Sequence, residues 1–250
     1  MGYVFDFNTT KAYEKWCDQP NHRPAIDRET GLMFELLNPM RGRRVLDIGC
    51  GHGIGLKALL DAGLEVTGLD PSPYMLDIAR MQLGNQADLH RGMAEDLPFE
   101  DNAFHYACIS KTLEFVELPE KTLEETLRVT RDRVFIGLVN RHALSTNIEK
   151  CSDLPISFCN QARFIGLLKL KKMIRRLAGN VPVSFQALWR PPAPAWKIAG
   201  KLMLVPLVQN MPISMYTGLV VSLNPQWKTR PLSLRIPAKH RTNVIIGQRG

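Results

Sequence analysis

A glycine-rich turn follows a run of strand-forming residues in the stretch VLDIGCGHG, at residues 45–53. Gly49, Gly51 and Gly53 carry no side chain, so backbone N–H groups in this turn can lie directly against a ligand. The next apolar run, LEVTGLD, ends in Asp70, which lies 21 residues after Gly49. A carboxylate at that point can accept two hydrogen bonds from a ribose diol. Together these features predict a ligand that contains a ribose.

Two classes of ribose-containing ligand fit a glycine turn followed by an acid at this spacing. A dinucleotide site requires the pattern G-x-G-x-x-G, because a pyrophosphate lies on the turn, and here Ile54 stands in place of the third glycine. Asp47 stands two residues before Gly49. Its carboxylate would repel a pyrophosphate but could accept a hydrogen bond from an ammonium group. The pattern therefore favours an amino-acid nucleoside over a nicotinamide dinucleotide.

The glycine turn lies within a region where apolar strands alternate with helical patterns, which predicts an α/β fold with a doubly wound, mostly parallel sheet and helices on both faces. Ligands bind such sheets at the carboxyl ends of the strands. The predicted elements up to residue 140 are a helix at 27–38, a strand at 43–49, a helix at 53–62, a strand at 64–70, a helix at 73–83, strands at 87–91 and 104–110, a helix at 119–130 and a strand at 133–139. The later pattern predicts an amphipathic basic helix at 163–179 and strands at 183–189 and 216–223.

Length and composition limit the class of protein. A chain of 250 residues with 45% apolar and 22% charged residues can form one well-buried α/β domain. It shows neither a signal sequence nor an apolar run of about 18–20 residues, so we expect a cytoplasmic protein. The five cysteines form no C-x-x-C pair and are expected to be reduced thiols, with no metal bound. The alternative, a metal held by Cys151, Cys159 and His142, lacks a further ligand.

Positive charge is concentrated in the second half of the chain. From Arg141 onward there are 17 Lys and Arg against two acids, a net charge of +15, so the first 140 residues carry −7 of the total of +8. This asymmetry indicates an anionic partner, such as a phosphorylated ligand, a membrane surface or nucleic acid, or else a basic face that contacts only water. The apolar, Pro-containing insertion at 190–212 is expected to be buried, to line an apolar site or to contact lipid. Residues 224–250 are expected to form a loose basic tail.

Four motifs in order carry a family resemblance: VLDIGCGHG, VTGLDPSPYMLDIAR, AEDLPFEDNAFHYA and EKTLEETLRV. They resemble the class I S-adenosylmethionine-dependent methyltransferases, in particular the group that includes quinone- and small-molecule-methylating enzymes. The resemblance covers about residues 40–140. It implies a Rossmann-like methyltransferase fold with a seven-stranded sheet, S-adenosyl-L-methionine as cofactor, and a single domain. The implied parts of this domain are an N-terminal helical lid at 1–40, a cofactor-binding core at 41–140, a basic C-terminal part at 141–223 and the tail.

The resemblance also implies where the cofactor lies. The turn at 49–51 would pass beneath its methionyl part, with Asp47 facing the amino group. Asp70 would hold the ribose hydroxyls, residues 71–75 would flank the adenine, and the backbone N–H of Ala94 would lie at the edge of the ring. The implied cofactor-binding residues are Asp47, Gly49, Cys50, Gly51, Asp70, Pro71, Ser72, Met75, Ala94, Glu95 and Ser110, the last of them near the transferable methyl group.

Two positions depart from the family pattern. Met93 stands where family members usually carry an acid that bonds the adenine amino group, so Glu95 or Asp96 would have to reach that group instead. His105 stands where an aspartate is common. We expect this second change to affect only packing at the end of a strand.

The chemistry of the acceptor is less defined. No dedicated base is assigned, although His142, Glu114 and Tyr106 are candidates by residue type. Tyr13 and Trp16 resemble the aromatic lid of some relatives. We expect a small, apolar or lipid-like acceptor, such as a quinone precursor, enclosed by the N-terminal helix and the insertion. The alternatives are an RNA or protein methyltransferase, or a non-catalytic relative that binds the cofactor or a membrane.

Overall fold

The computed structural model describes residues 2–139, 161–188 and 216–223. The predicted insertion at 190–212 and the tail at 224–250 therefore lie outside the described residues, as do His142, Cys151 and Cys159.

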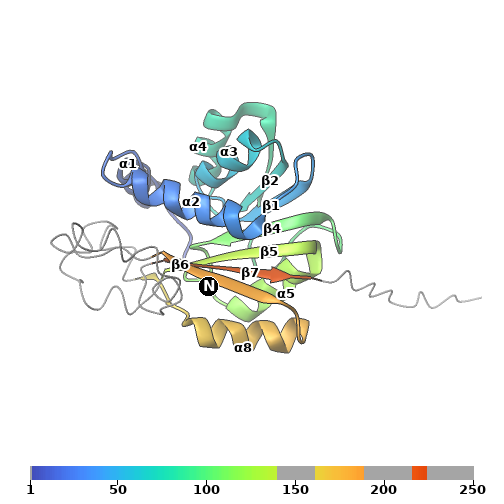
Figure 1. Cartoon of the computed structure of the whole chain (residues 1–250). Helices are drawn as coiled ribbons and strands as arrows, with labels where there is room; N and C mark the ends of the chain where they lie inside the picture. Colours follow the sequence, from blue (N-terminus) through green and yellow to red (C-terminus); the bar gives the residue numbers. More distant parts are fainter. Residues whose placement is uncertain (1, 140–160, 189–215, 224–250) are drawn as a thin grey trace, which may run out of the picture.

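A seven-stranded sheet forms the centre of the molecule, with strand order β3-β2-β1-β4-β5-β7-β6 (Figure 1). Neighbouring strands among the first five are parallel, whereas β7 is antiparallel to both β5 and β6. This confirms the predicted α/β class and the mostly parallel sheet. The strands are β1 (Arg44–Ile48), β2 (Glu65–Asp70), β3 (Ala87–Arg91), β4 (Phe104–Ser110), β5 (Thr130–Val139), β6 (Val183–Leu188) and β7 (Tyr216–Ser222).

Helices cover both faces of the sheet (Figure 1). Side chains of α2, α3 and α4 pack on one face, and those of α5 and α8 on the other. The helices are α1 (Phe7–Cys17), α2 (Arg23–Leu37), α3 (Ile54–Asp61), α4 (Pro73–Leu83), α5 (Pro119–Val129) and α8 (Leu167–Ala178), with a short 3-10 turn η1 (Gly84–Gln86) after α4.

Three predicted boundaries need correction. Helix α2 begins four residues before the predicted start at 27, because Pro24 fits the first turn of a helix. Strand β5 begins three residues early, since Thr130 already pairs with Phe104 across an irregularity in the ladder. Helix α8 begins at Leu167 rather than at 163, because Gly166 has an extended backbone with φ −73° and ψ 146°.

Two apolar layers hold the sheet in place. On one face Leu37, Leu56 and Leu76 are at most 1% exposed, and on the other Leu123 and Ile174 are equally buried. Each large aliphatic side chain that is fully buried stabilises the fold by roughly 1.5–3 kcal/mol. The packed layers therefore keep the carboxyl edge of the sheet, where the site lies, in one geometry.

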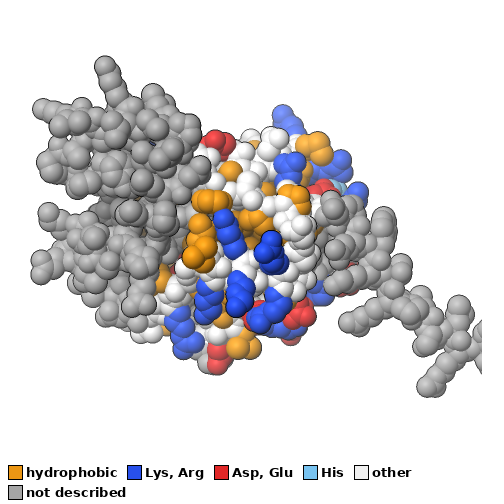
Figure 2. Space-filling model, turned by 60° about the horizontal axis from the view of Figure 1, so that its bottom comes forward, with side chains coloured by type: hydrophobic (Ala, Val, Ile, Leu, Met, Phe, Trp, Pro, Cys, Tyr) orange, Lys and Arg blue, Asp and Glu red, His pale blue; other side chains and the backbone are white. Residues whose placement is uncertain are grey.

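The basic helix predicted at 163–179 covers the sheet with its apolar side. Leu170, Met173 and Ile174 of α8 are buried in the core, while its Lys and Arg side chains form a row on the outer face (Figure 2). Leu168 lies on the same helix and is 84% exposed. Within the described residues no helix has the length and apolar character needed to span a membrane.

Candidate active site

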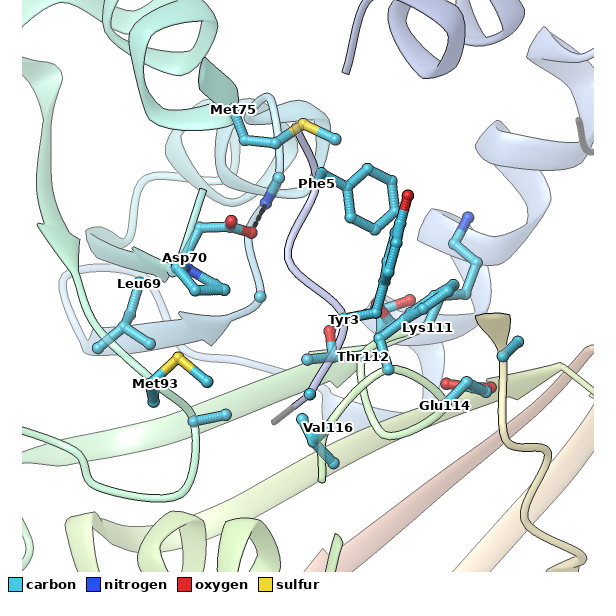
Figure 3. A pocket seen from close by; sticks show the side chains of 18 of the residues that line it. Tyr3, Phe5, Leu69, Asp70, Met75, Met93, Lys111, Thr112, Glu114 and Val116 are labelled. Atoms are coloured by element: carbon cyan, nitrogen blue, oxygen red, sulfur yellow. Dashed lines mark hydrogen bonds between the residues drawn. The ribbon is translucent and has the colours of Figure 1, made fainter. Parts of the chain in front are cut away.

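A cavity opens at the carboxyl ends of the strands β1, β2 and β4, and the N-terminal segment before α1 passes over it. Its space, including the open mouth, is about 1070 Å³. We call it the main cavity. Figure 3 shows Asp70, Met75 and Met93 on one side of it and Lys111 and Glu114 on the other, with Tyr3 and Phe5 between.

The glycine turn forms part of the floor of the main cavity. The N–H groups of Gly49 and Cys50 both donate to the carbonyl of Leu69, at 2.7 and 3.1 Å, which ties the turn to the end of β2. Gly49 has φ +73°, and a Cβ placed there would overlap the side chain of Thr112. Gly51 has φ +54°. Both positions need glycine because L-residues with side chains rarely adopt this left-handed backbone.

Asp70, the last residue of β2, connects two turns at the cavity. Its two carboxylate oxygens accept hydrogen bonds from the N–H groups of Gly51 and Ser72, each at 2.9 Å. Burial raises the pKa of Asp70, and these two hydrogen bonds oppose that shift. Each carboxylate oxygen can accept more than one hydrogen bond. The geometry therefore leaves acceptor capacity for a diol in the cavity.

The structure brings most of the predicted cofactor-binding residues to one place. Those that line the main cavity are Gly49, Gly51, Asp70, Pro71, Met75, Ala94, Glu95 and Ser110. Asp47 and Cys50 line a neighbouring cavity, which we call the side cavity and which shares Gly49, Gly51 and Ser110 with the main one.

Ser72 lines neither cavity, contrary to its predicted place beside the adenine. Its side chain is fully buried. The hydroxyl donates to the carbonyl of Phe5 at 2.6 Å and accepts from the N–H of Met75 at 3.3 Å. Ser72 thus caps α4 and holds the N-terminal segment over the cavity.

Asp47 is a buried carboxyl group without a cation beside it in the described structure. Burial, reinforced by the charge of Asp70, raises its pKa to about 7. An ammonium group in the side cavity would favour the ionised form of Asp47 and would itself be stabilised by it.

Glu95 is held at the edge of the main cavity by one oxygen only. Its Oε1 accepts from the N–H groups of Glu117 and Leu118, at 2.9 and 3.4 Å. Its Oε2 is buried and has no hydrogen-bond partner among the described residues. Asp96 is exposed and Met93 lines the cavity. Of the two acids considered at this edge, Glu95 is the one with an oxygen that a ligand donor could satisfy.

Two other predicted residues lie away from the cavity. His105 is at the start of β4, with its Nε2 at 3.0 Å from Arg43 Nη1 and its Nδ1 accepting from the N–H of Arg44. Tyr106 is 3% exposed, and its hydroxyl accepts from the N–H of Met40 at the opposite edge of the sheet from the cavity. Tyr106 therefore does not reach the site and is not a candidate base.

Only part of the proposed aromatic lid contacts the site. Tyr13 of α1 lines both cavities, and its ring packs edge-on against Phe5 and His52, with centroid distances of 6.0 and 5.4 Å. Trp16 lines neither cavity and stacks on His22, at 4.3 Å between ring centroids.

Several site residues were missed by the sequence reasoning. Lys111 follows β4 with φ +55°, and its Nζ pairs with Glu29 Oε2 of α2 at 2.6 Å. Tyr216 of β7 bonds the hydroxyl of Ser110 at 2.8 Å. The position of Lys111 directly after a strand was a usable signal. None existed for Tyr216, because it is 106 residues away from Ser110 in sequence.

Metal binding has no support in the described part of the chain. There, no group of three or more His, Cys, Asp or Glu side chains could hold an ion. Cys17, Cys50 and Cys108 are free and buried.

A family model for a methyltransferase domain matches residues 46–136, from β1 into β5. An uncharacterized methyltransferase of Mycobacterium tuberculosis is 36% identical over 129 residues, which are 51% of this chain and 48% of the relative. Both matches agree with the resemblance of the sequence motifs to the class I S-adenosylmethionine-dependent methyltransferases.

Named relatives of this chain include quinone-pathway enzymes. A demethylmenaquinone methyltransferase of Renibacterium salmoninarum is 39% identical over 100 residues, covering 40% of this chain and 42% of the relative. A ubiquinone biosynthesis O-methyltransferase of Aromatoleum aromaticum is 35% identical over 123 residues, which are 47% of this chain and 49% of the relative. The chain thus spans about half the length of the curated relatives it matches.

Solved structures share the fold of this chain. A S-adenosylmethionine-dependent methyltransferase of Thermotoga maritima superposes with a TM-score of 0.63 at 22% identity, covering 86% of this chain and 96% of that one. Magnesium protoporphyrin IX methyltransferase of Synechocystis was solved with bound S-adenosylhomocysteine. It superposes with a TM-score of 0.64 at 13% identity, and the match covers 88% of this chain and 96% of that one. At these identities the likeness concerns the fold.

Proposed function

We propose that this protein is an enzyme that transfers the methyl group of S-adenosylmethionine to a small, apolar or lipid-like acceptor by in-line displacement. The observation that carries this proposal is the main cavity. In it, the carboxylate of Asp70 and the glycine turn face the same space as a set of aromatic side chains. Curated relatives named for menaquinone and ubiquinone methylation support an acceptor of this class.

The residues present fit the cofactor in three ways. Asp70 retains acceptor capacity for the ribose, and Asp47 is a buried carboxyl group suited to an ammonium. The unpartnered Oε2 of Glu95 can accept from the adenine amino group, a role that the family usually gives to the position of Met93. The bound cofactor would supply an electrophilic methyl group on a sulfonium. Placing the acceptor atom in line with it can remove several kcal/mol of the barrier, about 7–11 in the best intramolecular cases.

Calorimetry with S-adenosylmethionine and S-adenosylhomocysteine tests the cofactor site. Asp70→Ala should lose most of the binding, since each hydrogen bond to a charged acceptor contributes about 1.5–3 kcal/mol. Asp77→Ala is the matched control, because Asp77 is on α4, has a 66% exposed side chain and pairs only with Arg80 among the described residues. Thermal melts of both variants separate loss of binding from loss of fold. Wild-type affinity in a folded Asp70→Ala variant would contradict the proposal.

We also propose that the outer face of α8 binds the surface of an anionic bilayer, from which an apolar acceptor could reach the site. The helix carries five basic residues and no acid. Lys169, Lys172 and Arg175 are exposed, and Leu168 on the same helix offers an apolar contact. The helix begins three residues after Phe164, which lines the main cavity. Each basic side chain near an anionic leaflet contributes about 1 kcal/mol.

Co-sedimentation with vesicles tests this surface. A variant with Lys169, Lys172 and Arg175 changed to Glu should bind vesicles that contain phosphatidylglycerol at least about tenfold more weakly than wild type. Neither protein should bind pure phosphatidylcholine. The control is a triple change to Glu at three exposed basic residues outside α8, each of which pairs with an acid of its own helix. These residues are Lys11, Arg23 and Lys57. Equal binding by wild type and the α8 variant would contradict the proposal.

A further inference from the structure

The half of the main cavity that faces away from Asp70 is lined by apolar rings. Tyr3, Phe5 and Phe115 form edge-on and tilted contacts, with centroid distances of 5.3, 5.5 and 6.2 Å within the group. Phe164 and Val139 complete the walls. We call this half the acceptor chamber. Its walls favour a flat aromatic ring system over a chain of polar groups, because aromatic pairs gain from offset and edge-on contacts.

One polar side chain in the acceptor chamber stands out by its burial. Glu114 lines the cavity and is 1% exposed. Its Oε1 accepts from the N–H of Val139 at 2.8 Å, whereas its Oε2 is buried with no hydrogen-bond partner in the part of the chain that the structure describes. A buried acceptor left without a partner costs about 1–3 kcal/mol. A ligand that donates a hydrogen bond to Oε2 would remove that cost.

The surroundings of Glu114 indicate what kind of donor fits. Lys111 is near enough to lower the pKa of Glu114, and Glu29, which pairs with Lys111, opposes that effect. Tyr216 is also within electrostatic range of Glu114. Lys111 is already paired with Glu29 at 2.6 Å, so it does not occupy Oε2 of Glu114. A neutral hydroxyl loses less hydration free energy than an ammonium group on entering a buried chamber with aromatic walls.

We infer that Glu114 Oε2 is the contact for a hydroxyl group carried by an aromatic ring of the acceptor, and that this hydroxyl is the methylated group. The inference rests on the proposed methyltransferase function and names the acceptor chemistry of the same site. It draws on the unpartnered oxygen of Glu114, the aromatic walls and the neighbouring Lys111.

The role of Glu114 in the transfer is that of a general base. The acceptor O–H bond breaks and its proton passes to Oε2, while a lone pair of the acceptor oxygen forms the new bond to the methyl carbon. The bond from that carbon to the sulfonium breaks and leaves its electron pair on sulfur, as a neutral thioether. Burial raises the pKa of Glu114 to about 7, which suits a base that acts near neutral pH.

Binding of three naphthalene probes tests the inference without relying on turnover. The probes are 1-naphthol, 1-methoxynaphthalene and the cationic 1-naphthylmethylamine, each titrated into the full-length protein saturated with S-adenosylhomocysteine. Wild type should bind 1-naphthol about tenfold more tightly than 1-methoxynaphthalene, the effect of one hydrogen bond to a charged acceptor. Glu114→Gln should abolish this preference. Its amide oxygen would stay on the N–H of Val139, which turns the NH₂ donor toward the probe.

The control variant is Glu124→Gln on α5, whose side chain is 56% exposed and pairs with Lys121. It should keep the preference for 1-naphthol. Calorimetry with S-adenosylhomocysteine separates the two proposals, since Glu114→Gln should bind it as wild type does. If wild type fails to bind S-adenosylhomocysteine, the proposed function fails. If it binds but shows no preference for 1-naphthol, prefers the amine, or keeps the preference in Glu114→Gln, the inference about Glu114 is overturned.

Discussion

The two halves of the main cavity differ in how their polar groups are satisfied. We call the half of the main cavity around Asp70 the cofactor half. There, Asp70 accepts hydrogen bonds from two backbone N–H groups, and the glycine turn is hydrogen-bonded to the end of β2. In the acceptor chamber, Glu114 has one oxygen bonded and the other unpartnered. The protein's own hydrogen bonds therefore hold Asp70 and the glycine turn in place before a ligand arrives, whereas the buried Oε2 of Glu114 has no partner among the described residues. Changes at the glycine turn should alter fold and cofactor binding together, whereas a change of Glu114 should alter acceptor binding and leave cofactor binding as it is.

The largest effect is expected at the glycine turn. Gly49→Ala places a Cβ on a left-handed residue, which costs about 1–2 kcal/mol, and forces it into Thr112. We expect a loss of at least about 2 kcal/mol in the free energy of unfolding and loss of S-adenosylhomocysteine binding, measured by urea denaturation and calorimetry.

Gly31→Ala on α2 is the control for that change. No heavy atom lies within 4 Å of a Cβ at Gly31, and alanine stabilises a helix interior by about 0.5–1 kcal/mol relative to glycine. Affinity of Gly49→Ala within twofold of wild type would show that the turn does not touch the cofactor.

The second effect is a pH dependence that separates the two halves. Burial raises the pKa of both Asp47 and Glu114 to about 7. Between about pH 4 and pH 7 the native state then binds more protons than the unfolded chain, so the free energy of unfolding falls as pH rises and levels off above about pH 7. Asp47→Asn and Glu114→Gln should each make this decrease in the free energy of unfolding smaller. Urea denaturation at pH 5 and pH 8 measures the decrease.

Cofactor binding should respond to only one of these two groups. Because an ammonium group favours ionised Asp47, affinity for S-adenosylhomocysteine should rise about tenfold between pH 6 and pH 8 in wild type and in Glu114→Gln. The rise should be absent in Asp47→Asn. A rise that persists in Asp47→Asn would show that Asp47 does not contact the ammonium group. Loss of the rise in Glu114→Gln would show that Glu114 acts on cofactor binding as well.

The smallest effect is expected at the edge of the cofactor half. Glu95→Gln should keep the contacts of Oε1 with Glu117 and Leu118 but replace the unpartnered oxygen by an NH₂ donor. We expect about three- to tenfold weaker binding of S-adenosylhomocysteine by calorimetry. S-inosylhomocysteine, which lacks the adenine amino group, should bind both proteins equally. An equal loss for both ligands would place Glu95 elsewhere than at that amino group.

The sequence predicted that the glycine turn and Asp70 lie together because both belong to short, continuous motifs. A strand that ends in a glycine turn and a second strand that ends in Asp70 meet at one edge in any parallel sheet of this kind. Ser72 lies outside the lining of the main cavity for a local reason as well. An aspartate–proline–serine sequence before a helix supplies a cap, and the cap position turned its hydroxyl into the protein rather than into the cavity.

The acceptor chamber could not be predicted in the same way. Its walls come from the N-terminal segment, the turn after β4, the end of β5 and the extended segment before α8. Glu114 was considered a candidate base only by residue type. Its orientation depends on the N–H of Val139, 25 residues away, and its burial depends on the segments that cover it.

The sequence by itself determined the α/β class, the position of nearly every described strand and helix, and the turn and carboxylate expected to hold the nucleoside. Each of these follows from local patterns of polarity and from backbone conformations that only glycine adopts readily. The tertiary structure alone decided that Tyr106 points away, that Ser72 is buried, and that Glu114, Lys111 and three aromatic rings enclose one chamber. Side-chain environment in a packed protein depends on which distant segments meet, and no local pattern encodes that.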